Sequence, residues 1–129
     1  MNKARILVID DEQIVCELLE QFLTNIGHEV RYALNGKDAL ELYKTFAPHL
    51  TLLDVIMPKM SGIAVLQRIR DMDKKSKVIM ISGMHDLEMA KEAITMGAVD
   101  YITKPVDLEF LAKFISQQVK EIFGSDEPD

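Results

Sequence analysis

Residues 50–62 of the chain read LTLLDVIMPKMSG, and the predicted fold is centred on this stretch. The run from Leu50 to Leu53 is apolar except for one threonine, with one proline shortly before it and another after it. Such a short apolar run predicts a β-strand that is buried on both faces. Because parallel sheets carry their sites at the carboxyl ends of their strands, Asp54 at the end of this run is a candidate functional residue.

The composition is typical of a globular protein with a single domain. The 129 residues are enough to bury roughly two-thirds of the unfolded surface. The net charge of −6 argues against direct nucleic-acid binding, which needs clustered Lys and Arg side chains that face phosphates. We predict one folded domain over residues 1–123 and a flexible acidic tail over residues 124–129.

The expected compartment follows from cysteine usage and from the apolar runs. Cys16 is the single cysteine and has no partner for an internal disulfide, which favours a reducing compartment. No apolar run approaches the roughly 20 residues that a membrane-spanning helix needs. The first apolar run, residues 6–9, is too short for a signal peptide and is followed directly by Asp10. The sequence therefore predicts a cytoplasmic protein without a membrane segment.

Strand-like runs alternate with helical periodicity along the whole chain. The strands begin near residues 4, 28, 50, 77 and 99, so one βα unit occupies about two dozen residues. Five such units predict an α/β fold, a single-domain (βα)5 doubly wound parallel sheet with helices on both faces. Such a sheet commonly has the strand order 2-1-3-4-5, which makes strands one and three neighbours. In the first helix Ile14, Val15, Leu18, Leu19, Phe22 and Ile26 recur at helical spacing. The fourth helix is expected over residues 86–96.

This layout brings charged side chains together at one edge of the predicted sheet. Asp10, Asp11 and Asp54 follow strands one and three, and such carboxylates repel one another by about 4 kcal/mol per close pair. Raised pKa values or a bound cation would offset this repulsion, and oxygen ligands without Cys or His favour Mg²⁺. Ser82 and Lys104 end strands four and five at the same edge. A carboxylate, a divalent cation, an ammonium and a hydroxyl are suited to phosphoryl transfer.

The chain resembles the receiver domain of two-component response regulators. The resemblance covers residues 4 to about 122 and implies the CheY-like, flavodoxin-like form of the predicted fold. It rests on four motifs in order: Asp10-Asp11, then Asp54 with Met57-Pro58 and Gly62, then Ser82-Gly83, and finally Lys104-Pro105.

The resemblance implies a phosphoacceptor with a magnesium ion rather than an enzyme that acts on a separate substrate. Asp54 would take a phosphoryl group from a phosphohistidine on a sensor histidine kinase or histidine phosphotransfer protein. Asp11 and Asp54, with the backbone carbonyl of Ile56, would hold Mg²⁺, and Asp10 would reach the ion through water.

The same resemblance implies a switch. Lys104 would pair first with the carboxylate and then with phosphoryl oxygens, and a cis peptide bond before Pro105 would aim it into the site. Ser82 would move towards the phosphoryl group, and Tyr101 would fill the vacated space. The face formed by helix four, strand five and helix five would then contact a downstream effector.

Two positions depart from the family pattern. Ile56 and Met84 are apolar where many members carry polar side chains that orient the hydrolytic water. We therefore expect slow autodephosphorylation. Gly83 replaces the usual alanine, which leaves room for the phosphoryl group and loosens the following loop.

Other interpretations of the same residues stay open. Asp10 and Asp11 suit a helix N-terminus, Ser82 suits a turn, and a half-exposed tyrosine such as Tyr101 is ordinary on an edge strand. A flavodoxin-like cofactor binder would need a phosphate loop where the chain has acids. A phosphatase of the haloacid dehalogenase type would need a second acid at Ile56. A docking module without phosphorylation would more often have lost a site residue. The sequence names neither the kinase nor the output, nor whether the chain is free-standing.

Overall fold

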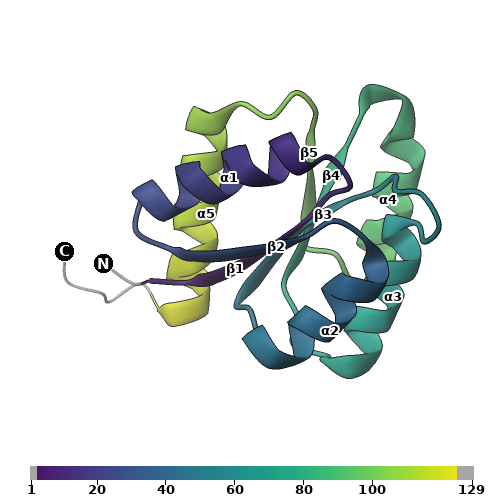
Figure 1. Ribbon diagram of the computed structural model, residues 1–129, viewed down its shortest axis with the longest axis horizontal. Helices are drawn as coiled ribbons and strands as arrows, with labels where there is room; N and C mark the ends of the chain where they lie inside the picture. Colours follow the sequence, from purple (N-terminus) through teal and green to yellow (C-terminus); the bar gives the residue numbers. More distant parts are fainter. Residues whose placement is uncertain (1–2, 125–129) are drawn as a thin grey trace.

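Strands and helices alternate along residues 3–124, the part of the chain that the computed structural model describes (Figure 1). The strands are β1 (Arg5–Ile9), β2 (Glu29–Ala33), β3 (Leu50–Asp54), β4 (Val78–Ser82) and β5 (Asp100–Thr103). The helices are α1 (Gln13–Asn25), α2 (Gly36–Phe46), α3 (Gly62–Met72), α4 (Leu87–Thr95) and α5 (Leu108–Phe123), and a 3-10 turn, η1 (Met84–Asp86), precedes α4. Residues 125–129 of the predicted tail lie outside the described residues.

The five strands form one parallel sheet in the order β2-β1-β3-β4-β5. The predicted doubly wound (βα)5 fold and its strand order are therefore confirmed. In the register of β1 and β3, Ile9 lies opposite Leu53. Because these two residues are level, Asp10 and Asp54, which follow them in sequence, meet at the same edge of the sheet.

Helices cover both faces of the sheet, with α1 and α5 on one face and α2, α3 and α4 on the other (Figure 1). All five residues of β3 and all five of β4 are buried, as expected for strands between two helical layers. One apolar core lies on each face of the sheet. Asp54 thus ends a strand that is buried throughout, which fixes the position of its backbone.

The buried face of α1 differs from the full set of apolar residues at helical spacing. The structure buries Cys16, Leu19 and Leu23, whereas the side chains of Ile14 and Leu18 are 80% and 50% exposed. An α-helix turns by about 100° per residue, so the face centred on residues 16, 19 and 23 directs residues 14 and 18 to the solvent side. The helical spacing was therefore predicted correctly, but two of the large apolar side chains that show it lie on the surface.

A second difference lies between β4 and α4. The sequence predicted a helix over residues 86–96, but the chain first forms the 3-10 turn η1, in which the N–H of Asp86 donates to the carbonyl of Gly83 (3.0 Å). The α-helix then extends from Leu87 to Thr95. The loop after Ser82 is therefore longer than the sequence suggested.

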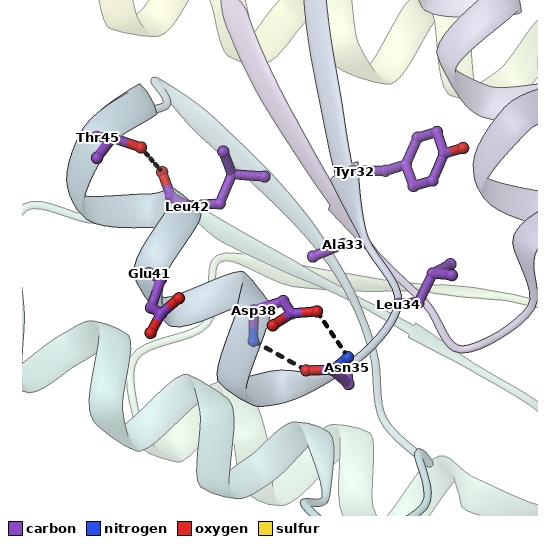
Figure 2. Close-up of a pocket in the computed structure, with 8 residues that line it drawn as sticks. All are labelled: Tyr32, Ala33, Leu34, Asn35, Asp38, Glu41, Leu42 and Thr45. Carbon is purple, nitrogen blue, oxygen red and sulfur yellow. Dashed lines mark hydrogen bonds between the residues drawn. The ribbon is translucent and has the colours of Figure 1, made fainter.

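The sheet ends in two edge strands, β2 and β5. Beside β2 a groove of about 590 Å³ opens between the carboxyl end of this strand and α2 (Figure 2). A second hollow, of about 520 Å³, lies beside β5 and the start of α5, where Tyr101 and Phe110 contribute to its lining.

Candidate functional site

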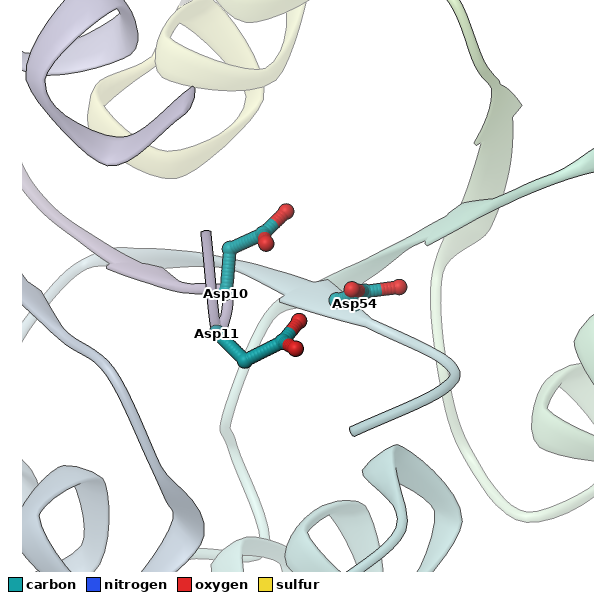
Figure 3. Close-up of side chains that lie close together, drawn as sticks. All are labelled: Asp10, Asp11 and Asp54. Carbon is teal, nitrogen blue, oxygen red and sulfur yellow. The ribbon is translucent and has the colours of Figure 1, made fainter. Parts of the chain in front are cut away.

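Three carboxyl groups meet at the carboxyl edge of the sheet. Asp10 and Asp11 follow β1 and Asp54 ends β3, and one carboxylate oxygen from each lies within 4.8 Å of the others (Figure 3). Asp10 and Asp54 are buried, whereas Asp11 is exposed. Two of the three carboxyl groups are therefore buried, and the third is accessible to solvent.

Backbone hydrogen bonds orient the two buried carboxylates. The N–H of Glu12 donates to Asp10 Oδ1 (2.9 Å), and the N–H of Ile56 donates to Asp54 Oδ1 (3.2 Å). In each case the backbone bond engages Oδ1 and leaves Oδ2 for other partners. Within residues 3–124, Asp10 Oδ2 is the one buried side-chain nitrogen or oxygen that lacks a hydrogen-bond partner.

Lys104 brings a positive charge to this cluster. Its Nζ lies 3.3 Å from Asp54 Oδ2, 3.4 Å from Asp10 Oδ2 and 3.7 Å from Glu12 Oε1. The N–H of Lys104 donates to the carbonyl of Ser82 (2.8 Å), and the peptide bond between Lys104 and Pro105 is cis. The backbone of Lys104 is thus anchored to the end of β4, and its ammonium lies near two buried carboxylates.

The local electrostatics favour the uptake of positive charge. Burial and the charge of Asp10 raise the pKa of Asp54 from 3.8 to about 6, although Lys104 opposes this shift. Burial also raises the pKa of Asp10. Burial alone would lower the pKa of Lys104, but the charges of Asp10 and Asp54 outweigh it, and that pKa is raised. One ammonium therefore only partly offsets the cost of burying two carboxylates.

The residues present fit a hard divalent cation. The cluster offers carboxylate oxygens alone, the ligands that Mg²⁺ prefers. Asp10 Oδ2 forms an ion pair with Lys104 but no hydrogen bond, so it keeps the capacity to face a cation. A cation there would also reduce the repulsion between Asp10, Asp11 and Asp54.

Ser82 and Tyr101 lie near this cluster but are not part of it. Ser82 is fully buried at the end of β4, and its hydroxyl donates to the carbonyl of Gly83 (2.9 Å). Tyr101 is half-buried on β5 and packs against the core that α2, α3 and α4 cover. The structure thus brings Asp10, Asp11, Asp54 and Lys104 together. Ser82 ends the adjacent strand, β4, and Tyr101 lies outside the cluster.

The loop after β3 is held close to the site by a glycine. A Cβ atom on Gly62 would lie 2.1 Å from the carbonyl oxygen of Asp54, so no larger residue fits without movement. The N–H of Gly62 donates to the carbonyl of Val55 (2.9 Å). The close approach of these two segments explains why the chain needs glycine here.

Sequence reasoning missed one charged residue of the site. Glu12 lies 3.7 Å from the ammonium of Lys104, and the signal was present, because Glu12 directly follows Asp10 and Asp11. The structure also shows how exposed the two unusual apolar residues are, with 46% exposure at Ile56 and 72% at Met84.

Comparison with known proteins identifies the family. Residues 6–116 match the response regulator receiver domain. This chain belongs to the response regulator receiver family. Receiver domains act in two-component signal transduction, where they take phosphoryl groups from histidine kinases and regulate output domains, and they bind Mg²⁺ at an acidic pocket.

Curated relatives differ in how much of their length the receiver occupies. The chain is 40% identical over 119 residues to the chemotaxis protein CheY of Treponema pallidum, covering 90% of this chain and 83% of that protein. It is 35% identical over 116 residues to the regulatory protein AtoC of Escherichia coli, covering 90% of this chain but 25% of AtoC. Relatives thus include both small receivers and long regulators.

Solved structures of receivers agree with the fold. The receiver domain of NtrX from Brucella abortus matches with a TM-score of 0.84 and 34% identity, covering 89% of this chain and 98% of that one. A CheY-like receiver protein from Methanospirillum hungatei matches with a TM-score of 0.88 and 29% identity, covering 94% and 97%. Across the part of this receiver that the structure describes, no helix has the length and apolar character needed to cross a bilayer.

Proposed function

We propose that Asp54 of this receiver is the phosphoacceptor and that a sensor histidine kinase or histidine phosphotransfer protein is its donor. The observation that carries the proposal is the position of Asp54, a buried carboxylate with a raised pKa, 3.3 Å from the ammonium of Lys104 and clustered with Asp10 and Asp11. A carboxylate in this setting is ionised near neutral pH and can act as a nucleophile.

The transfer is a displacement at phosphorus. An oxygen of Asp54 bonds to the phosphorus atom as the phosphorus–nitrogen bond of the phosphohistidine breaks, and the leaving imidazole nitrogen keeps the electron pair and takes a proton. Lys104, now 3.3 Å from Asp54 Oδ2, then pairs with the phosphoryl oxygens. Charge stabilisation of this kind supplies most of the catalysis in phosphoryl transfer.

A magnesium ion would be held by Asp11, Asp54 and the backbone carbonyl of Ile56, with Asp10 reaching it through water. This assignment is supported by the oxygen-only cluster and by the buried Oδ2 of Asp10, which forms an ion pair with Lys104 but no hydrogen bond. When bound, the ion supplies positive charge that neutralises the phosphoryl oxygens. Asp10 and Asp11 hold and orient it, and Lys104 supplies the remaining positive charge.

The signal would pass through Ser82 and Tyr101. In the structure the Ser82 hydroxyl donates to the carbonyl of Gly83, so it is free to exchange this weak local bond for a phosphoryl oxygen. Tyr101 would then turn towards the space that the loop after Ser82 leaves. The face of α4, β5 and α5 would change shape and present the hollow beside Phe110 to an effector.

The surroundings of the site suit a protein donor. Ile14 and Leu18 on α1 and Ile56 in the loop after β3 expose large apolar side chains, although the chain carries a net charge of −6. Exposed apolar groups of this kind favour a protein contact over a nucleic-acid contact. The cytoplasmic location and the absence of nucleic-acid and membrane binding stay predictions.

Incubation with acetyl phosphate tests the phosphoacceptor role, with the mass of the intact protein as the readout. We expect a gain of one phosphoryl group that needs Mg²⁺, disappears in Asp54→Asn and persists in the matched control Asp71→Asn, whose side chain is exposed. A folded protein that gains nothing with Mg²⁺, or an Asp54→Asn variant that gains as much as the wild type, would contradict the proposal and favour a docking module without phosphorylation.

The acyl phosphate should hydrolyse slowly. Attack by water needs a polar side chain that orients it, and the exposed side chains of Ile56 and Met84 offer no hydrogen-bonding group suited to this. We expect the double variant Ile56→Asn, Met84→Glu to lose its phosphoryl group faster than the wild type. The control Ile14→Asn, an exposed apolar residue on α1, should not change the rate. Equal rates for the double variant and the wild type would refute this explanation.

A further inference from the structure

The groove beside β2 lies at the opposite edge of the sheet from β5 (Figure 1). We call it the β2 groove, and its lining includes Tyr32, Leu34, Asp38 and Glu41 (Figure 2). We propose that the β2 groove binds an extended peptide segment that alternates basic and apolar side chains. The proposal is independent of phosphorylation at Asp54.

One wall of the groove is a free strand edge. β2 pairs with β1 alone, because it is the outermost strand of the sheet. The N–H of Glu29 and the carbonyl of Ala33 bond towards β1. Since alternate residues of a parallel strand face the same neighbour, the N–H and carbonyl groups of Val30 and Tyr32 face outwards. An extended peptide satisfies such an edge through main-chain hydrogen bonds.

The opposite wall is acidic. Asp38 and Glu41 are exposed on α2, and within residues 3–124 neither carboxylate forms an ion pair with a Lys or Arg side chain. Asp38 Oδ2 accepts a hydrogen bond from the side chain of Asn35 (3.0 Å), which holds the carboxylate near the strand end (Figure 2). Among residues 3–124 no Lys or Arg lines the groove, so its charge complements basic side chains of a partner.

The two faces of β2 set the order of side chains in the peptide. Ala33 faces α2, whereas the side chains of Tyr32 and Leu34 point to the other side of the strand and pack against the core under α1 (Figure 2). Side chains of an added strand alternate in the same way. Basic side chains at every second position would therefore face Asp38 and Glu41, and the intervening apolar side chains would pack beside Tyr32.

The position of Arg31 limits where the basic side chains of a bound peptide can lie along β2. Its guanidinium lies over the ring of Phe46, 5.4 Å from the centroid, at the end of α2 that is far from Asp38. A basic side chain beside Arg31 would be repelled, so the basic residues match the carboxyl end of the strand. β2 has five residues and spans about 16 Å, which sets a peptide length of about five residues.

A second copy of this chain is a poorer occupant. Pairing of β2 with β2 of another molecule would bring two acidic grooves together, and each copy carries a net charge of −6. Charge complementarity thus favours a basic segment of a different protein.

Amide chemical shifts of the ¹⁵N-labelled chain test the proposal with two capped peptides as probes, Lys-Val-Lys-Val-Lys and Glu-Val-Glu-Val-Glu. We expect the lysine peptide to shift the amides of residues 30–42 and to slow hydrogen exchange at Val30 and Tyr32. We expect no shift with the glutamate peptide. Asp38→Asn with Glu41→Gln should weaken binding by roughly 3- to 30-fold, the loss of two exposed charge pairs.

The matched control is Glu88→Gln with Glu92→Gln, two exposed acids on α4, which lies on the same face of the sheet as α2 but packs against β4 and β5 near the opposite edge. This variant should leave binding unchanged. An unchanged affinity in the Asp38, Glu41 variant, shifts confined to other elements, equal shifts with both peptides, or no shift at millimolar peptide would each overturn the proposal. A variant that fails to fold would be recognised from its own spectrum, and Asp38→Asn alone would then replace it.

Discussion

Replacement of Asp54 by asparagine should stabilise the receiver in the absence of divalent cations. Asp54 is 5% exposed and shares its site with Asp10, and the resulting pKa of about 6 compares with 3.8 for an unburied aspartate. Asparagine has nearly the same shape but no charge, so Asp54→Asn removes the cost of ionising this group. The hydrogen bond from the N–H of Ile56 can be kept by the amide oxygen.

The sign and size of the effect follow from linkage. Because the folded-state pKa of Asp54 is raised, the folded state binds the proton more tightly, and stability falls as pH rises from 3.8 to about 6. A difference of about 2 pKa units corresponds to about 3 kcal/mol. Lys104 loses one of its carboxylate partners in the variant, so we expect a gain of about 2 to 3 kcal/mol near pH 7.5 and almost none near pH 3.5.

Urea denaturation in EDTA measures this difference directly, with wild type, Asp54→Asn and the control Asp71→Asn compared at several pH values. The gap between wild type and Asp54→Asn should open between the two pKa values, and the control should stay within about 0.5 kcal/mol of wild type. Added Mg²⁺ should narrow the gap, because a ligand that binds the folded wild type stabilises it. An Asp54→Asn variant that is less stable than wild type at pH 7.5, or a gap that does not change with pH, would refute the reasoning.

Three further stability predictions are open to the same urea measurement. Gly62→Ala should lower the free energy of unfolding by about 3 kcal/mol or more, since its Cβ would lie 2.1 Å from a backbone oxygen at the end of β3. A loss below about 1 kcal/mol would contradict this close contact between the two segments. Leu19→Ala should cost about 2 to 5 kcal/mol and the half-exposed Leu18→Ala less than about 1 kcal/mol, and the reverse order would contradict the face assigned to α1. Burial lowers the pKa of His28, whose buried Nδ1 accepts a hydrogen bond from the N–H of Ala4. The contribution of neutral His28 to folding stability is therefore complete above pH 6.5 and is lost as the pH falls. We expect His28→Gln to reduce the loss of stability on the acid side.

Much of the fold could be predicted from the sequence because strand ends carry strong signals. The apolar runs and their spacing were enough for five parallel strands in the correct order, since crossover connections are right-handed and short. That order alone predicts that Asp10 lies beside Asp54, and the structure brings these carboxyl groups together. The approach of Lys104 followed from its place at the end of β5.

The differences arose where tertiary packing decides between similar patterns. On α1, the apolar residues at helical spacing include Ile14 and Leu18, which face solvent, and a sequence pattern does not distinguish a core leucine from a surface one. The 3-10 turn after Ser82 depends on a single backbone hydrogen bond that no residue type specifies. The direction of the Ser82 hydroxyl, towards Gly83 rather than Asp54, depends equally on local geometry.

Localisation of the acyl phosphate tests the central claim most directly. The protein would be treated with acetyl phosphate and Mg²⁺ and then with borohydride, which reduces an aspartyl phosphate to homoserine, and the modified residue would be located by peptide mass analysis. The account predicts homoserine at position 54 and at no other aspartate, with none formed when Mg²⁺ is withheld. Homoserine at Asp10 or Asp11, or an unmodified Asp54 in a phosphorylated protein, would contradict it.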